Sequence, residues 1–258
     1  MTRKLYAERP GWGKDFDYDE ARHLAAYRYA AKRAKSKVVL DAGCGEGFGT
    51  QTLADVAASV VGIDYHAESI ETARAHWKKP NLSFRVLDLS TEKLDENAYD
   101  VIVNFQVLEH IEDDRAFLAR LKAGLKRNGT LILTTPNAPM SFSENPFHLR
   151  EYTAVELRKL LSQVFDHVEV FGVFGNEKVQ AFDRQRRCAV ERILKLDAFG
   201  IRKLLPDKMM HAAFARLGQL VRKQAHRKAG PAPIVPEDFE VRGGKLDEAL
   251  DLLALCRA

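Results

Sequence analysis

The stretch Val38-Val39-Leu40-Asp41-Ala42-Gly43-Cys44-Gly45-Glu46-Gly47 decides the fold of this chain. An apolar, β-branched run ends in an acidic residue and passes into a loop with glycine at every second position, from Gly43 to Gly49. Glycine lets the backbone turn with positive φ and lets a ligand lie against bare main chain. In an open α/β sheet, ligands bind in the crevice at the carboxyl ends of the strands, so this loop predicts a nucleotide-type site.

Two further acidic residues follow predicted strands at the spacing that such a site needs. Asp64 ends the apolar run 59–63, and Asp88 follows the run 82–87. Because the carboxyl ends of parallel strands meet at one edge, we expect both carboxylates to lie beside the glycine loop with Asp41. The alternative for each is an acid that only caps a helix N-terminus.

Strands and helices alternate along the first two thirds of the chain, the pattern of a parallel sheet built from βαβ units. The predicted strands are 37–41, 59–63, 82–87, 100–104, 130–135 and 167–174, and the predicted helices are 19–34, 48–57, 67–77, 113–125 and one that opens at Thr153 with Glu156 as a capping box. The apolar run 252–256 predicts a seventh strand, antiparallel beside the sixth. We therefore expect an α/β, Rossmann-like, mostly parallel sheet of seven strands with helices on both faces.

The expected domain organisation has three parts. Residues 1–36 form an N-terminal cap with a helix, and residues 37–176 and 246–258 form the sheet domain. Residues 177–245 form a helical insertion and linker between the sixth and seventh strands, because the regular alternation stops there and prolines follow.

Composition and charge bound the class of protein. No apolar run approaches the roughly 18 residues that span a bilayer, the N-terminus carries no secretory pattern, and the three cysteines are widely spaced. We therefore expect a cytoplasmic protein. Residues 184–228 hold thirteen lysines and arginines against three acids, in a chain of net charge +4. This basic block predicts peripheral contact with an anionic membrane, and its alternative is the solvated face of ordinary helices.

Taken together, these motifs resemble those of the class I S-adenosylmethionine (SAM)-dependent methyltransferases. The resemblance covers about residues 20–175 and the final strand. It is carried by the segments Asp41–Gly47, Gly62-Ile63-Asp64, Leu87-Asp88-Leu89 and Asn104-Phe105-Gln106-Val107-Leu108-Glu109-His110. It implies SAM as the cofactor and methyl transfer as the activity.

The resemblance also assigns a cofactor role to individual residues. Asp41 anchors the loop near the amino-acid end of SAM, where Gly43, Gly45 and Gly47 approach its methionine part, and Asn104 and Gln106 belong to the same site. Asp64 accepts both ribose hydroxyl protons, as the equivalent acid does in dinucleotide folds. Asp88 faces the adenine amino group, Leu89 supplies a backbone amide, and Tyr65 and Leu89 enclose the adenine ring.

Two histidines are the candidate catalytic residues. Methyl transfer from a sulfonium requires alignment of donor and acceptor, and removal of the acceptor's proton if the acceptor is a hydroxyl. His110 lies in the loop after the fourth strand, and His148 lies in the segment 145–152, which we expect to arch over the same edge. Histidine suits a base at neutral pH. The alternatives are that His148 and Arg150 only pin their loop, and that His110 only bonds loop backbone.

Other reaction classes and a metal are less consistent with the motifs. Phe48 stands where a dehydrogenase fingerprint needs its third glycine, and Asn104-Phe105-Gln106 lacks the two prolines of nucleic-acid amino-methyltransferases, so no DNA partner is expected. Some ubiquinone-biosynthesis O-methyltransferases place Glu-x-x-Glu-His at 106–110 to hold a divalent metal. Gln106 replaces the first glutamate here, and an amide is a poorer ligand for a hard cation, so no metal is predicted.

The acceptor is predicted only as a class. The segments 145–156 and 20–24 resemble bacterial methyltransferases of cell-envelope glycans and lipid-linked saccharides. We therefore expect O-methylation of a small-molecule, glycan or lipid-linked acceptor, with the 177–245 insertion as its lid. A SAM-binding partner or sensor protein without turnover, and an RNA methyltransferase that uses the basic block, stay open as alternatives.

Overall fold

The computed structural model describes residues 17–141, 148–196 and 233–258. The chain forms two compact units. The core unit consists of His23–Met140, His148–Phe174 and Val241–Ala258, and the accessory unit consists of Met1–Arg22, Ser141–Phe147 and Gly175–Glu240. The core unit holds the residues that the sequence assigns to the cofactor and to catalysis.

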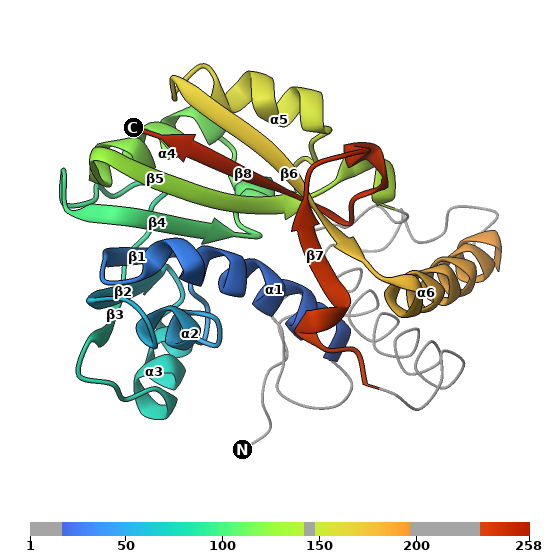
Figure 1. Cartoon of the computed structure of the whole chain (residues 1–258), viewed down its shortest axis with the longest axis horizontal. Helices are drawn as coiled ribbons and strands as arrows, with labels where there is room; N and C mark the ends of the chain where they lie inside the picture. Colours follow the sequence, from blue (N-terminus) through green and yellow to red (C-terminus); the bar gives the residue numbers. More distant parts are fainter. Residues whose placement is uncertain (1–16, 142–147, 197–232) are drawn as a thin grey trace. The chain divides into compact units, whose positions relative to one another are not determined.

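A mixed sheet forms the centre of the core unit (Figure 1). Its strands are β1 (Val38–Ala42), β2 (Ser59–Asp64), β3 (Leu82–Val86), β4 (Tyr99–Phe105), β5 (Leu125–Pro136), β6 (His167–Gly175), β7 (Phe239–Arg242) and β8 (Asp251–Arg257). The strand order is β3-β2-β1-β4-β5-β8-β6-β7. Pairing is parallel from β3 through β5. The order reverses between β1 and β4, and this is the switch point at which open α/β sheets bind ligands.

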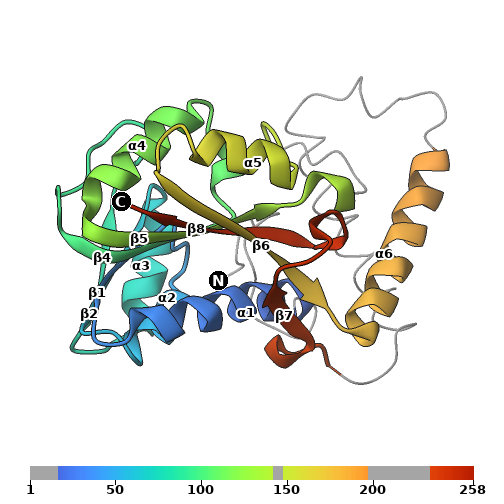
Figure 2. The same cartoon turned by 45° about the horizontal axis from the view of Figure 1, so that its top comes forward.

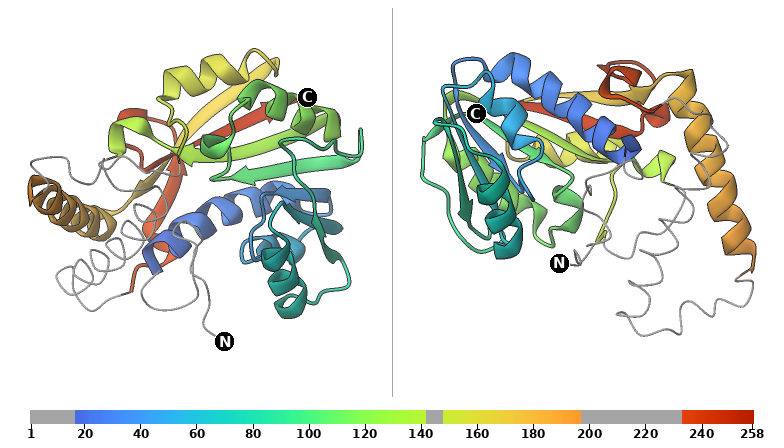
Figure 3. Two further views of the ribbon diagram at one scale, coloured as in Figure 1. Left: turned by 180° about the vertical axis from the view of Figure 1, so that it is seen from behind. Right: turned by 90° about the horizontal axis from the view of Figure 1, so that it is seen from below.

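The last strand runs against its neighbours. β8 is antiparallel to β5 on one side and to β6 on the other, and the chain ends beside β5 (Figure 3). The predicted Rossmann-like α/β fold, with an antiparallel last strand beside the sixth, is therefore confirmed. The predicted count of seven strands is wrong by one. The four-residue strand β7 lies in the segment that the prolines had marked as linker.

Helices cover both faces of the sheet, as predicted. The described helices are α1 (Asp17–Ala34), α2 (Thr50–Ala54), α3 (Ala67–His76), α4 (Asp114–Gly124), α5 (Ala154–Leu161) and α6 (Glu177–Leu196), of which α6 and residues 17–22 of α1 belong to the accessory unit. In the core unit, α4 and α5 lie on one face, whereas α2 and the adjoining part of α1 lie on the other (Figure 2). The capping box of α5 is confirmed, since Thr153 and Glu156 each accept a hydrogen bond from the other's backbone N–H.

Two element boundaries differ from the sequence prediction for local reasons. Helix α2 begins at Thr50 rather than at 48, because the aromatic ring of Tyr27 packs directly on Gly49 and the glycine loop extends that far. Strand β5 begins at Leu125 rather than at 130. The Asn128-Gly129 pair lies inside the strand, where Asn128 has a φ of 66° and the pairing with β4 shifts register.

The core packs the inner strands against α4. Leu40, Ile102 and Leu131 from neighbouring strands are fully buried, together with Phe117 and Leu121 of α4. Burial of apolar area at about 25 cal/mol per Å² drives this packing, which fixes the carboxyl ends of β1 and β4 side by side.

The accessory unit has a small centre of its own around Tyr18. The Tyr18 ring stacks on Phe182 at a centroid distance of 4.8 Å and meets Phe239 edge-on at 5.8 Å. The guanidinium groups of Arg22 and Arg186 lie 5.6 and 5.1 Å from the ring centroid. Cation–π contacts of this kind add stability to buried aromatic rings.

Part of the predicted insertion lies outside the described residues. That part includes most of the basic block. The described beginning of the insertion, α6, is helical as expected. The three-part domain division and the lid role stay predictions. Among the helices described here, none is long and apolar enough to cross a membrane.

Candidate functional site

The glycine loop after β1 has the conformation that its sequence predicts. Gly43, Gly45 and Gly47 have φ values of 88°, 54° and 77°, which side-chain-bearing residues rarely adopt. A Cβ at Gly43 would lie 2.4 Å from Val107 Cγ2, whereas a Cβ at Gly45 would meet no atom of the described residues within 4 Å. The loop is therefore packed against the protein at Gly43 and open at Gly45, which is where a ligand can lie against main chain.

Asp64, at the end of β2, fastens this loop. Its carboxylate is 7% exposed and accepts hydrogen bonds from the Gly45 and His66 backbone N–H groups, both at 2.9 Å. The backbone N–H groups of Gly43 and Cys44 donate to the carbonyl of Ile63 at 2.8 and 2.9 Å. The loop and the end of β2 thus form one unit, and the Asp64 carboxylate lies at its rim.

Asp41 anchors the loop from inside the protein. Its carboxylate is fully buried and accepts hydrogen bonds from Thr50 Oγ1 at 2.7 Å and from Tyr27 Oη at 3.0 Å. Burial raises the pKa of Asp41 to about 7, although both hydrogen bonds favour its charged form. These contacts hold α1 and the start of α2 against the end of β1, consistent with the anchoring role that was predicted.

The predicted adenine residues differ in exposure. Tyr65 is 68% exposed, so its ring is open for an adenine ring to stack on. Leu89 is 7% exposed and packs in the core. The Asp88 carboxylate accepts hydrogen bonds from the backbone N–H and hydroxyl of Ser90 at 2.8 and 2.6 Å. The enclosure of an adenine ring by Tyr65 and Leu89 stays a prediction.

The end of β4 adds a buried polar group beside the loop. The Asn104 amide is 1% exposed and donates to the Ala42 carbonyl at 2.7 Å, while its Oδ1 has no hydrogen-bond partner within the described part of the chain. Buried polar atoms are nearly always hydrogen-bonded, so this acceptor fits a donor supplied by a ligand. The ammonium group of SAM is such a donor.

Gln106 follows in an unusual conformation. Its φ is 55°, a left-handed backbone that costs energy for a residue with a side chain and that clusters at functional sites. The Gln106 backbone N–H donates to the Thr134 carbonyl at 2.9 Å, and its amide lies 3.3 Å from Thr134 Oγ1. The side chain is therefore held toward β5.

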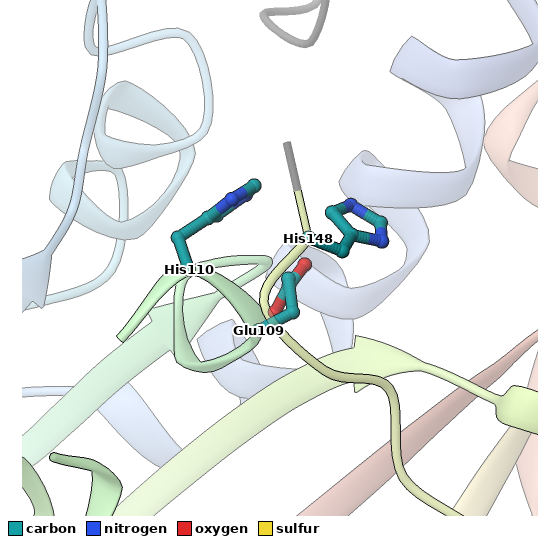
Figure 4. Close-up of side chains that lie close together, drawn as sticks. All are labelled: Glu109, His110 and His148. Atoms are coloured by element: carbon teal, nitrogen blue, oxygen red, sulfur yellow. The ribbon is translucent and has the colours of Figure 1, made fainter. Parts of the chain in front are cut away.

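Three side chains converge just beyond β4, as Figure 4 shows. They are Glu109 and His110, from the 3-10 turn Leu108–His110, and His148; one ligand-type atom from each lies within 4.8 Å of the others. The imidazole centroids of His110 and His148 are 5.1 Å apart. The two predicted catalytic histidines are thus neighbours.

Glu109 is the buried member of this cluster. It is 1% exposed, and its Oε2 accepts a hydrogen bond from Thr135 Oγ1 at 3.1 Å. Its Oε1 is buried with no hydrogen-bond partner among the residues described. Burial raises the pKa of Glu109 to about 8. A buried carboxyl with an unsatisfied oxygen beside two imidazoles can bind a cation or accept and release a proton.

Hydrogen bonds and an ion pair hold the segment 148–151 beside the cluster. The Leu149 backbone N–H donates to the Glu109 carbonyl at 2.9 Å, and His148 Nδ1 lies 2.7 Å from the Glu151 carboxylate. Arg150 forms an ion pair with Asp114 at the start of α4. Arg150 therefore pins the loop, the structural role considered for it, while His148 faces the cluster.

Sequence reasoning missed three contributors to the site. Glu109 had been considered only as part of the metal motif, and its burial beside Thr135 gave no sequence signal. Glu151 lies three residues after His148, a spacing that could have suggested the pair. Tyr27 was not among the predicted site residues, although its hydroxyl holds Asp41.

The same cluster is a plausible donor set for a metal ion. One carboxylate and two imidazoles fit borderline divalent cations, and the orphaned Glu109 Oε1 is available to one. The prediction of no metal depended on Gln106 alone, whereas His148 arrives from a distant segment as a third donor.

Comparison with known proteins assigns the family. A model of the methyltransferase domain matches residues 33–191. A probable SAM-dependent methyltransferase of Mycolicibacterium smegmatis is 37% identical over 181 residues, which cover 67% of this chain and 69% of that protein. The chain belongs to the SAM-dependent methyltransferases. Its cofactor is therefore SAM, as predicted.

Other relatives of this methyltransferase are matched over a smaller share. A probable SAM-dependent methyltransferase of Mycobacterium tuberculosis is 35% identical, over 63% of this chain and 61% of that protein. A ubiquinone biosynthesis O-methyltransferase of Pelagibacter ubique is 37% identical over 111 residues, 43% of this chain and 46% of that protein. This methyltransferase thus spans less than half of that O-methyltransferase.

A solved structure supports the fold alone. A SAM-dependent methyltransferase of Thermotoga maritima, described as a possible histamine N-methyltransferase, aligns over 93% of this chain and 91% of its own, with a TM-score of 0.59 and 12% identity. At that identity the likeness says nothing about the acceptor, because one fold hosts many reactions.

Proposed function

We propose that this methyltransferase moves the methyl group of SAM to a hydroxyl oxygen of a small-molecule, glycan or lipid-linked acceptor. The observation that carries the proposal is the Glu109–His110–His148 cluster. It joins a buried, partly unsatisfied carboxyl to two imidazoles beside the end of β4. A hydroxyl acceptor must lose a proton during transfer, and this cluster provides groups that can promote that loss.

SAM is held, in this proposal, at the switch point between β1 and β4. The open face of Gly45 takes the methionine part, and Asn104 Oδ1 accepts a hydrogen bond from its ammonium group. Asp64 binds the ribose hydroxyls, with Asp88 and the exposed Tyr65 ring on the adenine side. The positions of these residues along β1, β2 and β4 support this arrangement, because the strands end at one edge.

His148 and Glu151 act as a pair in the proton step. The Glu151 carboxylate at 2.7 Å favours a proton on His148 Nδ1, which makes Nε2 the acceptor nitrogen of the ring. Such a carboxylate–imidazole pair orients the ring and sets its tautomer. Loss of His148 should therefore affect turnover rather than SAM binding.

The proposed acceptor class has two supports. The curated relatives include ubiquinone biosynthesis O-methyltransferases, one of which is 37% identical over 111 residues. The segments 145–156 and 20–24 also resemble methyltransferases of bacterial envelope glycans. The second support is a sequence resemblance only.

Contact with an anionic membrane through residues 184–228 stays a separate proposal. In the accessory unit, Arg186 lies over the Tyr18 ring and 3.8 Å from the Asp19 carboxylate, so at least one charge of the block has an internal role. Flotation with anionic vesicles tests the rest. A variant with Arg187, Arg202 and Lys203 neutralised should float less than the wild type, and equal flotation removes the idea.

An acceptor screen tests the proposed function. The purified chain is incubated with SAM and panels of hydroxyl and amine acceptors, and the release of S-adenosylhomocysteine is measured. We expect turnover with hydroxyl acceptors. His148→Ala should lose this turnover, and the control His167→Ala, which changes an exposed histidine, should retain it. Turnover with amine acceptors alone contradicts O-methylation. SAM binding without any turnover favours the partner or sensor alternative.

A further inference from the structure

We propose that Glu109, His110 and His148 bind one divalent cation of the borderline class, such as Zn²⁺, in preference to Mg²⁺. The proposal rests on the proposed function only for the role of the cation, because it says how the cluster acts on an acceptor hydroxyl. Binding itself depends on the three side chains alone and is measured without an acceptor.

The donor chemistry decides which cation fits. Two imidazoles and one carboxylate are the ligands of many zinc and iron sites, whereas Mg²⁺ requires oxygen ligands in octahedral geometry. Gln106, where a second carboxylate would add an oxygen, has its amide 3.3 Å from Thr134 Oγ1. The cluster is thereby left with two nitrogen donors and one oxygen donor.

The geometry needs only a modest closure of the three side chains. Ligand atoms at about 2.0–2.2 Å from a tetrahedral Zn²⁺ lie about 3.3 Å from one another. The corresponding atoms here lie within 4.8 Å of one another, so movements of roughly an ångström suffice. Glu109 is fixed by Thr135 and His148 by Glu151, so the closure is a small adjustment of side chains that already face one another.

The unsatisfied oxygen of Glu109 is a second, independent indication. Glu109 Oε1 is buried without a hydrogen-bond partner in the described part of the chain, and the Glu109 carboxylate lies beside the two histidines (Figure 4). A buried carboxylate oxygen that has lost water costs free energy unless a donor or a cation replaces it. A bound cation removes this cost, and it supplies a charge that lowers the pKa of a coordinated hydroxyl.

Glu151 is the positioning residue for this site. Its carboxylate lies 2.7 Å from His148 Nδ1, which leaves Nε2 as the ligand nitrogen. With the cation bound, Nε2 no longer accepts a proton, and the cation instead lowers the pKa of the acceptor hydroxyl. A histidine ligand whose other ring nitrogen donates to a carboxylate is the usual arrangement around zinc, and loss of the carboxylate typically weakens metal affinity 10- to 100-fold. Both side chains are mostly buried, so solvent competes little with the pair.

Calorimetric titration of the full chain tests the proposal. The protein is freed of metal with a chelator and dialysed, and ZnCl₂ and MgCl₂ are then titrated in separate experiments. One equivalent of Zn²⁺ should bind at least 100-fold more tightly than Mg²⁺. Glu109→Gln and His148→Ala should each weaken Zn²⁺ binding at least 10-fold, and Glu151→Gln about 10-fold.

Control variants make the result specific. His167→Ala removes an exposed histidine at the start of β6 and should bind Zn²⁺ as the wild type does. Circular dichroism of the metal-free variants checks that they are folded. Zn²⁺ binding unchanged in the His110→Ala/His148→Ala double variant overturns the proposal, and so does Mg²⁺ binding as tight as that of Zn²⁺.

The two proposals fail separately. Zn²⁺ binding that depends on the cluster, without turnover on any hydroxyl acceptor, contradicts the proposed function and leaves the metal site intact. Turnover on hydroxyl acceptors with no cluster-dependent Zn²⁺ binding contradicts the metal site and leaves the proposed function intact.

Discussion

The carboxylate of Asp64 accepts a hydrogen bond from the backbone N–H of Gly45 at 2.9 Å, and so ties the end of β2 to the most open point of the glycine loop. One side chain thereby shapes the loop and, as proposed, binds the ribose.

We expect Asp64→Ala to weaken SAM binding about 10- to 100-fold, since one or two charge-assisted hydrogen bonds of about 1.5–3 kcal/mol are lost. Calorimetric titration with SAM measures this change. Asp95→Ala, which removes an exposed carboxylate that pairs with Arg85, is the matched control and should bind SAM normally. Wild-type affinity in Asp64→Ala would show that the ribose is bound elsewhere.

Two glycines of the loop should respond differently to alanine. In Gly43→Ala the new Cβ meets Val107 at 2.4 Å at a φ of 88°, so we expect a loss of about 2–4 kcal/mol in the free energy of unfolding. In Gly45→Ala the Cβ enters open space, and only the φ of 54° costs about 1–2 kcal/mol.

The open space at Gly45 should nevertheless matter for the ligand. We expect Gly45→Ala to lower SAM affinity even though it costs less stability than Gly43→Ala. The added methyl group occupies the surface that the methionine part of SAM approaches. Urea unfolding and SAM titration of both variants check this. Equal stability losses in the two variants would contradict the packing described for Gly43.

Much of this site could be predicted from the sequence, because strand-end acids and glycines depend on local backbone and on strand order. Asp41, Asp64 and the glycine loop lie where that logic placed them. The parts that could not be predicted depend on contacts between distant segments. The partners of Glu109 are Thr135 and the 148–151 segment, and no spacing rule links them. The short strand β7 was missed because it is four residues long and follows three prolines.

Stability should depend on pH through Asp41. Burial raises the pKa of this carboxyl from 3.8 to about 7, so the folded state binds a proton that the unfolded state has lost between these values. The contribution of this proton to the free energy of unfolding is complete below about pH 4 and is lost as the pH rises to about 7. The free energy of unfolding falls by at most about 1.4 kcal/mol for each pH unit in that range.

Asp41→Asn isolates this contribution, because the amide keeps an acceptor for Thr50 and Tyr27 but does not titrate. The stability of the wild type relative to this variant should fall as the pH rises from about 4 to 7 and then level off. Urea unfolding at a series of pH values measures the difference. A difference that is constant across this range would mean that Asp41 is charged throughout.

Two variants of the loop that carries His148 should distinguish residues that stabilise the loop from the one that takes part in catalysis. Asp114 accepts hydrogen bonds from Arg150 and from the buried hydroxyl of Tyr152, so Asp114→Ala leaves that hydroxyl without its acceptor and should cost about 1–3 kcal/mol of stability. His148→Ala removes a partly buried ring whose Nδ1 is bonded to Glu151, and should lower the melting temperature little. Turnover should fall at least 10-fold in His148→Ala at unchanged SAM affinity, because the ring belongs to the cluster that acts on the acceptor. If His148→Ala instead melts as early as Asp114→Ala, the histidine holds the loop and does no chemistry.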